Sequence, residues 1–272
     1  MSFRRIIPCL DTTLDSSGKP VVVKGVEFEG LRYAGDPISL AKKYDRQGAD
    51  EVIFLDITAS VDKRHTMLNV VRELVGEISV PLGVGGGISS IEDFEQAIEA
   101  GAAKVGMNTA AVRTPSLIRL ASSRFGSSRT VIAIDCKSRT QGIEGKTVLK
   151  ATSGRSVWYE VVILGGRRPT GLDAVRWAEE VQDLGAGEIL LTSKDRDGTK
   201  AGYDLVITKA IAEAVEIPVI ASGGVGKPEH IYEAFRDAKA DACLAASIFH
   251  YDQYTIKQVK KYLRKQGVPV RL

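Results

Sequence analysis

Two aspartates, Asp11 and Asp135, each directly follow a short apolar run of the chain. The runs, 5–10 and 131–134, are typical of strands that are buried on both faces. Two carboxylates that flank one substrate can remove a proton on one side and donate a proton on the other. Aspartate is also a common capping residue after a strand, so each of the two could instead cap its own loop. Their matching placement after apolar runs favours an acid–base pair.

Three further charged residues follow predicted strands or lie in a long connection. Asp56 and Asp195 are equally compatible with supporting the acid–base pair and with capping ordinary loops. Lys24 comes at the end of a long segment, 12–24, whose tip at 15–20 is rich in Ser, Gly and Pro and is predicted to be a mobile loop. Lys24 could close this loop over an anionic substrate, and a solvated lysine is the alternative.

Glycine-rich turns between a strand and a helix form the second kind of candidate site. The apolar run 218–221 ends in Ser-Gly-Gly before a helical pattern, and the run 81–84 ends in three glycines. Such turns bring backbone N–H groups together, which suits a phosphate group. Turn and cap chemistry explains one such set more easily than two at matching positions. We predict two phosphate sites, the first made by Gly85, Gly86, Gly87, Asn108 and Thr109, and the second by Asp197, Gly198, Ser222, Gly223, Gly224 and Ser247.

Apolar runs alternate with amphipathic segments along all 272 residues, which indicates repeated βα units and a parallel sheet. Eight such units in a chain of this length predict a single (β/α)8 TIM-barrel domain spanning 1–272, with a doubly wound open sheet as the alternative. In a closed barrel, strands one and five face each other across the mouth, as an acid–base pair requires. The predicted strands are 5–10, 52–55, 81–84, 105–107, 131–134, 189–191, 218–221 and 242–246. The predicted helices are 37–47, 62–75, 90–100, 115–125, 172–184, 203–215, 228–238 and 255–265.

The two halves of the chain, about 1–125 and 126–272, resemble each other. Residues 48–56 align with 185–193, and 81–88 align with 218–225 at the same spacing. Equal spacing in separate blocks predicts two half-barrels, each with one phosphate site. A β-hairpin, with strands in 146–152 and 157–164, is predicted as an insertion after strand five.

Composition narrows the class of protein. Apolar residues make up 44% and charged residues 26% of the chain, as in ordinary globular proteins. The net charge of +3 does not favour nucleic-acid binding, and no apolar stretch is long enough to span a bilayer. The three cysteines are an odd number in apolar runs, which indicates buried reduced thiols and a cytoplasmic protein. The three histidines share no metal-binding spacing, so we expect neither a metal ion nor a cofactor.

Four charged residues lie near strand starts: Arg5, Glu51, Lys104 and Glu188. Charges at that end of a barrel usually contribute to stability or form a solvated rim. Their mixed signs would also let them pair and close the bottom of the barrel.

The order and content of these motifs resemble the cyclase subunit family of imidazole glycerol phosphate synthase, in the histidine pathway. The resemblance extends from residue 4 to about residue 250. The matching stretches are 5–11 (RIIPCLD), 22–25 (VVKG), 54–60 (FLDITAS), 84–88 (VGGGI), 108–111 (NTAA), 133–135 (AID), 187–193 (GEILLTS), 195–199 (DRDGT), 221–224 (ASGG) and 245–247 (AAS).

The resemblance implies a lyase that takes ammonia from a glutaminase partner. It would convert phosphoribulosyl formimino aminoimidazole carboxamide ribonucleotide into imidazole glycerol phosphate and aminoimidazole carboxamide ribonucleotide. Asp11 and Asp135 match the family's catalytic pair, Lys24 matches a lysine of its closing loop, and both phosphate sites match. The four strand-start charges match a ring through which ammonia enters, with the partner docked at that face. The chain departs from the family pattern at its longer segment 13–20 and at Ala103, where the family commonly has an aspartate.

Two other functions fit parts of the pattern. A phosphoribosyl formimino isomerase of the same pathway shares the repeat, both phosphate sites and an aspartate pair, but needs no ammonia. A non-catalytic phosphate-binding barrel would need neither aspartate. The charged residues at the strand starts and the DRDGT stretch favour the cyclase.

Overall fold

The computed structural model describes residues 3–26, 29–57 and 64–272, and the side chains of residues 24–31 and 58–66 are outside this description. The chain forms two compact units. Unit 1 comprises Met1–Met107 together with Leu244–Leu272, and unit 2 comprises Asn108–Cys243. Within the described ranges, no helix is long and apolar enough to cross a membrane.

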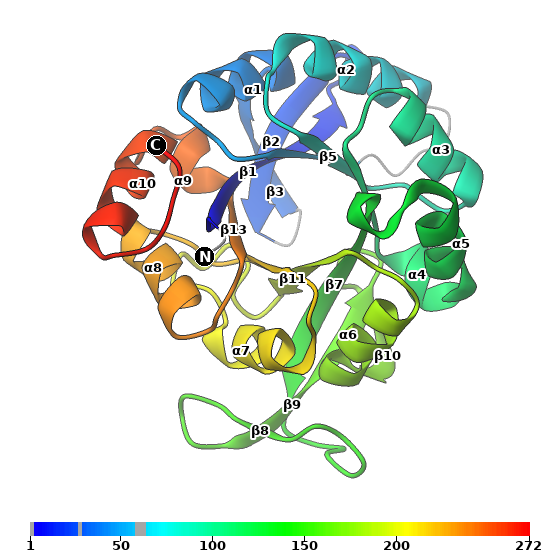
Figure 1. The fold of residues 1–272 in the computed structure, drawn as a ribbon, viewed down its shortest axis with the longest axis vertical. Helices are drawn as coiled ribbons and strands as arrows, with labels where there is room; N and C mark the ends of the chain where they lie inside the picture. Colours follow the sequence, from blue (N-terminus) through cyan, green and yellow to red (C-terminus); the bar gives the residue numbers. More distant parts are fainter. Residues whose placement is uncertain (1–2, 27–28, 58–63) are drawn as a thin grey trace. The chain divides into compact units, whose positions relative to one another are not determined.

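Unit 1 contains four core strands that run parallel to one another. They alternate with helices that lie on one side of them (Figure 1), and polar residues begin these helices. Asp36 accepts a backbone N–H at the start of α1, and Ser90 and Asp93 form a capping box at α3. The strands are β1 (Arg5–Leu14), β4 (Val52–Asp56), β5 (Leu82–Gly85) and β6 (Lys104–Met107). The helices are α1 (Pro37–Arg46), α2 (Arg64–Glu77), α3 (Ile91–Glu99), α9 (Ser247–His250) and α10 (Ile256–Lys265).

The segment after the core of β1 is ordered as strands, so the prediction of a long loop over 12–24 is wrong. β1 continues to Leu14 and pairs antiparallel with β2 (Pro20–Val26), which pairs with β3 (Glu29–Gly35). The turn between β1 and β2 is closed by Asp15, whose carboxylate accepts the backbone N–H groups of Ser17 and Lys19. The β-branched residues on either side of this turn pair across it, which is why a hairpin forms here.

Unit 2 repeats the pattern of parallel strands alternating with helices. Its core strands pair in the order β7, β11, β12 and β13. They are β7 (Thr130–Arg139), β11 (Glu188–Ser193), β12 (Val219–Ser222) and β13 (Ala242–Ala245). The helices are α4 (Thr109–Arg113), α5 (Ser116–Phe125), η2 (Ser127–Arg129, a 3-10 turn), α6 (Ala174–Asp183), α7 (Leu205–Ala214) and α8 (Pro228–Arg236). The described residues thus contain eight parallel βα units, four of them completed in each half of the chain, and the (β/α)8 fold class is confirmed.

The predicted hairpin after strand five is present and belongs to a larger antiparallel sheet. β8 (Leu149–Lys150) pairs with β9 (Ser156–Ile163), which also pairs with β10 (Arg168–Asp173). β9 lies against the extension of β7, from Asp135 to Arg139. The β8–β9 end points away from the rest of unit 2 (Figure 1). β7 therefore carries a parallel core strand and an antiparallel extension in one continuous segment.

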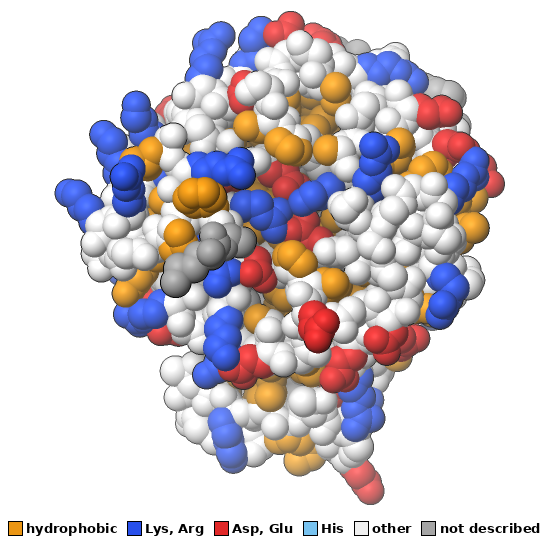
Figure 2. All heavy atoms as spheres, in the orientation of Figure 1, with side chains coloured by type: hydrophobic (Ala, Val, Ile, Leu, Met, Phe, Trp, Pro, Cys, Tyr) orange, Lys and Arg blue, Asp and Glu red, His pale blue; other side chains and the backbone are white. Residues whose placement is uncertain are grey.

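The last helix, α10, is amphipathic and fastens the end of the chain to unit 1. Lys and Arg side chains gather over its outward face (Figure 2). Lys260 is different, because its ammonium is buried and lies 2.7 Å from Asp50 Oδ1. Asp50 Oδ2 in turn accepts the backbone N–H of Ile6 in β1 at 2.8 Å. The backbone N–H of Arg4 also donates to the carbonyl of Pro269, so both chain ends are held together in unit 1.

Candidate active site

Asp135 lies on β7 in unit 2, at the residue where the strand leaves its parallel partner for the antiparallel extension. Nδ2 of Asn108 donates a hydrogen bond to Asp135 Oδ2 at 2.9 Å. Burial raises the pKa of Asp135 to about 6, while Lys194 opposes this rise and the negative charge of Asp197 adds to it. A carboxylate with a pKa of about 6 is suited to exchanging protons near neutral pH.

The hydrogen bond to Asp135 also fixes the orientation of the Asn108 side-chain amide. An ionised Asp135 can only accept, so the Asn108 atom facing it must be the NH2 group. The other amide atom, Asn108 Oδ1, is buried and has no hydrogen-bond partner in the described part of the chain. A buried acceptor beside a carboxylate fits a ligand that carries N–H groups.

Lys194 is a residue of this site that the sequence did not indicate. It follows β11, its side chain is 3% exposed, and its ammonium donates to Asp197 Oδ2 at 2.8 Å. Its backbone N–H donates to the carbonyl of Cys136, the residue after Asp135. The lysine lies between Ser193 and Asp195. Nothing in the local sequence pattern distinguishes it from a solvated loop lysine.

Asp195 supports the strand that carries Asp135. Its Oδ2 accepts the backbone N–H of Ser138 in the β7 extension at 2.7 Å. A second support is buried at the end of the segment that joins β11 to α7. There, Asp204 accepts from Tyr159 Oη and from Ser193 Oγ, each at 3.0 Å. Of the two readings left open for Asp195, the geometry favours support.

The second predicted phosphate turn is held by close backbone contacts in unit 2. Gly223 and Gly224 both have positive φ, and a Cβ on Gly224 would lie 2.4 Å from the carbonyl oxygen of Gly202. The backbone N–H of Gly202 donates to the carbonyl of Gly224, so the turns after β11 and β12 are joined. The structure therefore brings Asp197, Gly198, Ser222, Gly223 and Gly224 into neighbouring turns of unit 2, whereas Ser247 begins α9 in unit 1.

Asn108 and Thr109 of the first predicted phosphate site begin α4 in unit 2. Oγ1 of Thr109 accepts the backbone N–H of Leu164, at the end of β9. Leu164 has a positive φ of 56°, which is uncommon for a leucine. The start of α4 is thus tied to the inserted sheet.

The three glycines of the first site lie in unit 1, after β5. A Cβ on Gly86 would lie 2.0 Å from the carbonyl oxygen of Asp56, and its φ is +87°. Both facts require glycine there. This contact places the turn after β5 directly against the end of β4, where Asp56 is half-buried.

Asp11 lies on β1 in unit 1 and is buried. Cys9 donates from Sγ to Asp11 Oδ1 at 3.2 Å. Asp11 pairs in register with Leu55, one residue before Asp56. It therefore stands at the same strand ends as the first glycine turn.

Three of the four predicted strand-start charges meet in unit 1. Glu51 Oε2 accepts from Arg5 Nη1 at 3.0 Å and from Lys104 Nζ at 2.8 Å, and the Glu51 side chain is 4% exposed. Glu188 is buried at the start of β11 in unit 2. Lys24 lies in β2, but its side chain is outside the described residues.

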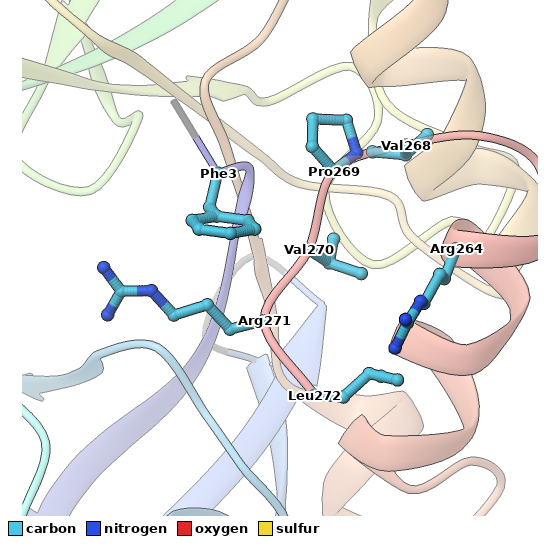
Figure 3. A pocket seen from close by; sticks show the side chains of 7 residues that line it. All are labelled: Phe3, Arg264, Val268, Pro269, Val270, Arg271 and Leu272. Carbon is cyan, nitrogen blue, oxygen red and sulfur yellow. The ribbon is translucent and has the colours of Figure 1, made fainter. Parts of the chain in front are cut away.

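A hollow of about 600 Å³ lies apart from these aspartates, at the amino end of β1. Phe3, Arg264 and the last five residues line it, and Phe3 and Arg271 lie side by side along its edge (Figure 3). It is shallow and open, unlike an enclosed substrate site. No group of three or more His, Cys, Asp or Glu side chains in the described ranges is arranged to hold a metal ion.

Comparison with known proteins shows the family to which the chain is similar. A family model described as histidine biosynthesis protein matches residues 5–255. A protein of Methanosarcina mazei named imidazole glycerol phosphate synthase subunit HisF is 56% identical over 274 aligned positions, which cover 100% of both chains. Proteins with the same name from Methanocaldococcus jannaschii and Methanothermobacter thermautotrophicus are each 54% identical over 277 positions, again over both full lengths.

Proposed function

The chain belongs to the histidine biosynthesis protein family, and from this premise we propose that it catalyses the cyclase reaction of imidazole glycerol phosphate synthase. It is an enzyme of histidine biosynthesis, and the lyase class fits it. The observation that carries the proposal is that the chain shares more than 50% sequence identity with HisF subunits along its full length. The substrate would be phosphoribulosyl formimino aminoimidazole carboxamide ribonucleotide, which ammonia converts into imidazole glycerol phosphate and aminoimidazole carboxamide ribonucleotide.

The substrate carries a phosphate at each end, which suits two separate glycine turns. Gly85, Gly86 and Gly87, with Asn108 and Thr109, would hold one phosphate through backbone N–H groups and short polar side chains. The other phosphate would be held by Asp197, Gly198, Ser222, Gly223, Gly224 and Ser247. Gly86 supports this role, because its approach to Asp56 leaves the turn no side chain that could block a ligand.

Ring closure requires attack of nitrogen on a carbonyl carbon and loss of water, and bond cleavage requires further proton transfer. We assign the principal acid–base role to Asp11. Asp135 would assist and would position the incoming ammonia by accepting a hydrogen bond from it, with Asn108 Oδ1 accepting a second N–H. The pKa of about 6 supports this role, since most Asp135 side chains are ionised at pH 7.

The relatives are named as subunits, which implies a further chain in their enzymes. For this chain we propose a glutaminase partner docked at the amino ends of the strands, with ammonia entering past Arg5, Glu51, Lys104 and Glu188. The hydrogen-bonded cluster on Glu51 supports a gate. The ion pairs that Arg5 and Lys104 make with this one buried carboxylate could break to open a path and then form again. The hollow beside Phe3 lies at the same end of β1 and is open to such a partner. We place the enzyme in the cytoplasm, in line with three cysteines that are all buried.

The test is turnover of the ribulosyl substrate with ammonium salts and no partner. Release of both products supports the cyclase. Interconversion of ribosyl and ribulosyl substrates without use of ammonia would assign the isomerase reaction instead. Asp11→Asn separates catalysis from mere phosphate binding, and turnover at the wild-type rate in that variant would exclude the acid–base role. Lys24→Ala probes closure, for which a higher KM is expected.

A further inference from the structure

Lys194 brings a positive charge into the part of unit 2 that holds Asp135. Only 3% of its side chain is exposed, and its ammonium pairs with Asp197, a member of the proposed second phosphate site. A buried ion pair contributes little net stability, because desolvation offsets the attraction between the charges. A structural role therefore does not by itself account for a lysine in this position.

The main chain and the aliphatic stem of Lys194 are held by their surroundings. Its backbone N–H donates to Cys136 O, so its main chain is in register with β7 one residue after Asp135. Gly166, in the turn between β9 and β10, packs against the lysine stem. A Cβ on Gly166 would lie 3.0 Å from Lys194 Cε, and its φ of +89° also favours glycine. The turn of the inserted sheet is thus shaped around the lysine.

The charged and titratable groups around Asp135 in unit 2 can be named. Lys194 favours its ionised form, Asp197 opposes it, and the amide of Asn108 and the hydroxyl of Thr192 donate to it. Cys136 is a buried thiol whose pKa is raised by burial and by Asp204, Asp135 and Asp195, so it stays neutral. Lys194 is therefore a cation that opposes the effect of burial on Asp135 within this unit.

We propose that Lys194 is a positioning residue that keeps Asp135 ionised at neutral pH and neutralises Asp197, so that the loop after β11 can accept a phosphate. One ammonium would thereby act on two groups, the carboxylate of Asp135 and the proposed phosphate site that contains Asp197. The proposal rests on the proposed function for the role of Asp135, but the ionisation of Asp135 can be measured without turnover.

The experiment compares Lys194→Met with Lys194→Arg and with a control, Lys239→Met, which removes an exposed ammonium paired with Glu213 in the same unit. The first measurement is the pH dependence of kcat/KM for ammonia-dependent turnover, with free ammonia held constant at each pH. The acid limb should move up by about one pH unit or more in Lys194→Met, as expected for loss of a close opposite charge. Lys194→Arg should keep most of the wild-type profile, and Lys239→Met should match it.

The second measurement is infrared titration of the Asp135 carboxyl, identified by its absence in Asp135→Asn. It reports the same pKa shift even if the chain turns over no ribulosyl substrate, so failure of the proposed function and failure of this inference are distinguishable. An unchanged acid limb and an unchanged titration in folded Lys194→Met would overturn the inference. A raised KM at every pH with no shift would also overturn it, because Lys194 would then act on the phosphate alone. If Lys194→Met does not fold, Asp197→Asn takes its place, and loss of this like charge should move the acid limb down.

Discussion

The amide of Asn108, at the start of α4, donates a 2.9 Å hydrogen bond to the carboxylate of Asp135, on β7. The bond stabilises the ionised carboxylate, so its removal should raise the pKa of Asp135 above about 6. We expect Asn108→Ala to move the acid limb of kcat/KM up by roughly half a unit to one unit. Asn69→Ala removes an exposed amide that accepts a hydrogen bond from Arg72, and its profile should stay at the wild-type position.

Asp135 should also destabilise the folded chain at neutral pH. Its folded pKa of about 6 lies above its ordinary value of 3.8, so the folded state binds the proton more tightly than the unfolded state. The contribution to stability is full below pH 3.8 and is lost as the pH rises through 6. Asp135→Asn should therefore raise the free energy of unfolding at pH 7 by about 1–3 kcal/mol while it lowers turnover.

The measurement is urea unfolding of both proteins between pH 3.5 and 8. The advantage of Asp135→Asn should grow from pH 4 to pH 7 and then level off. A constant difference across this range would contradict a raised pKa in the folded state.

Gly86 tests the first phosphate turn. Gly86→Ala places a methyl group against the carbonyl of Asp56 at a φ of +87°, so we expect a loss of at least about 2 kcal/mol in stability or a displaced turn with a higher KM. Gly76→Ala is the matched control, since Gly76 lies in α2 with open space around it. That change should raise stability by up to about 1 kcal/mol, because alanine is the better helix former. Thermal unfolding and substrate titration distinguish the two.

The buried pair of Lys260 and Asp50 should matter for stability and not for chemistry. Lys260→Met leaves a buried carboxylate without its cation and should cost about 3–5 kcal/mol in the free energy of unfolding. The double variant with Asp50→Asn should recover part of this loss. Additive losses in that double-mutant cycle would show that the two side chains do not interact.

The cluster on Glu51 leads to a prediction about the source of ammonia. Arg5→Ala removes one of its two cations, and turnover driven by glutamine and the partner should change several-fold more than turnover with ammonium salts. Lys42→Ala, which removes an exposed ion pair with Glu77, serves as the control. Equal effects of Arg5→Ala on both activities would remove the gate hypothesis.

Much of the fold could be predicted because its core strands are short apolar runs between amphipathic helices. The predicted run 131–134 is the centre of β7, and the predicted helix 255–265 differs from α10 by one residue. The hairpin after β1 was missed although Asp15 and Gly18 mark a turn. The two strands pair through few residues, and the residues of the turn between the strands are all polar or glycine, which is also typical of a loop.

The candidate site was predicted in part. Asp11 and Asp135 end apolar runs, and the glycine turns have a repeated pattern, so residue type and spacing were enough to propose them as site residues. Lys194 has no such pattern. Its importance comes from burial and from contacts with Asp197 and Gly166, which depend on tertiary packing that sequence spacing does not contain.

Unit 1 is built from two segments that are far apart in the sequence, and this has a consequence for folding during synthesis. Residues 1–107 are synthesised before unit 2, but their partners in residues 244–272, including Lys260 and Pro269, are synthesised after unit 2. Unit 2 is one continuous stretch and can complete its contacts while synthesis continues. Unit 1 therefore begins before unit 2 and is completed after it, and its apolar strands must wait for α10.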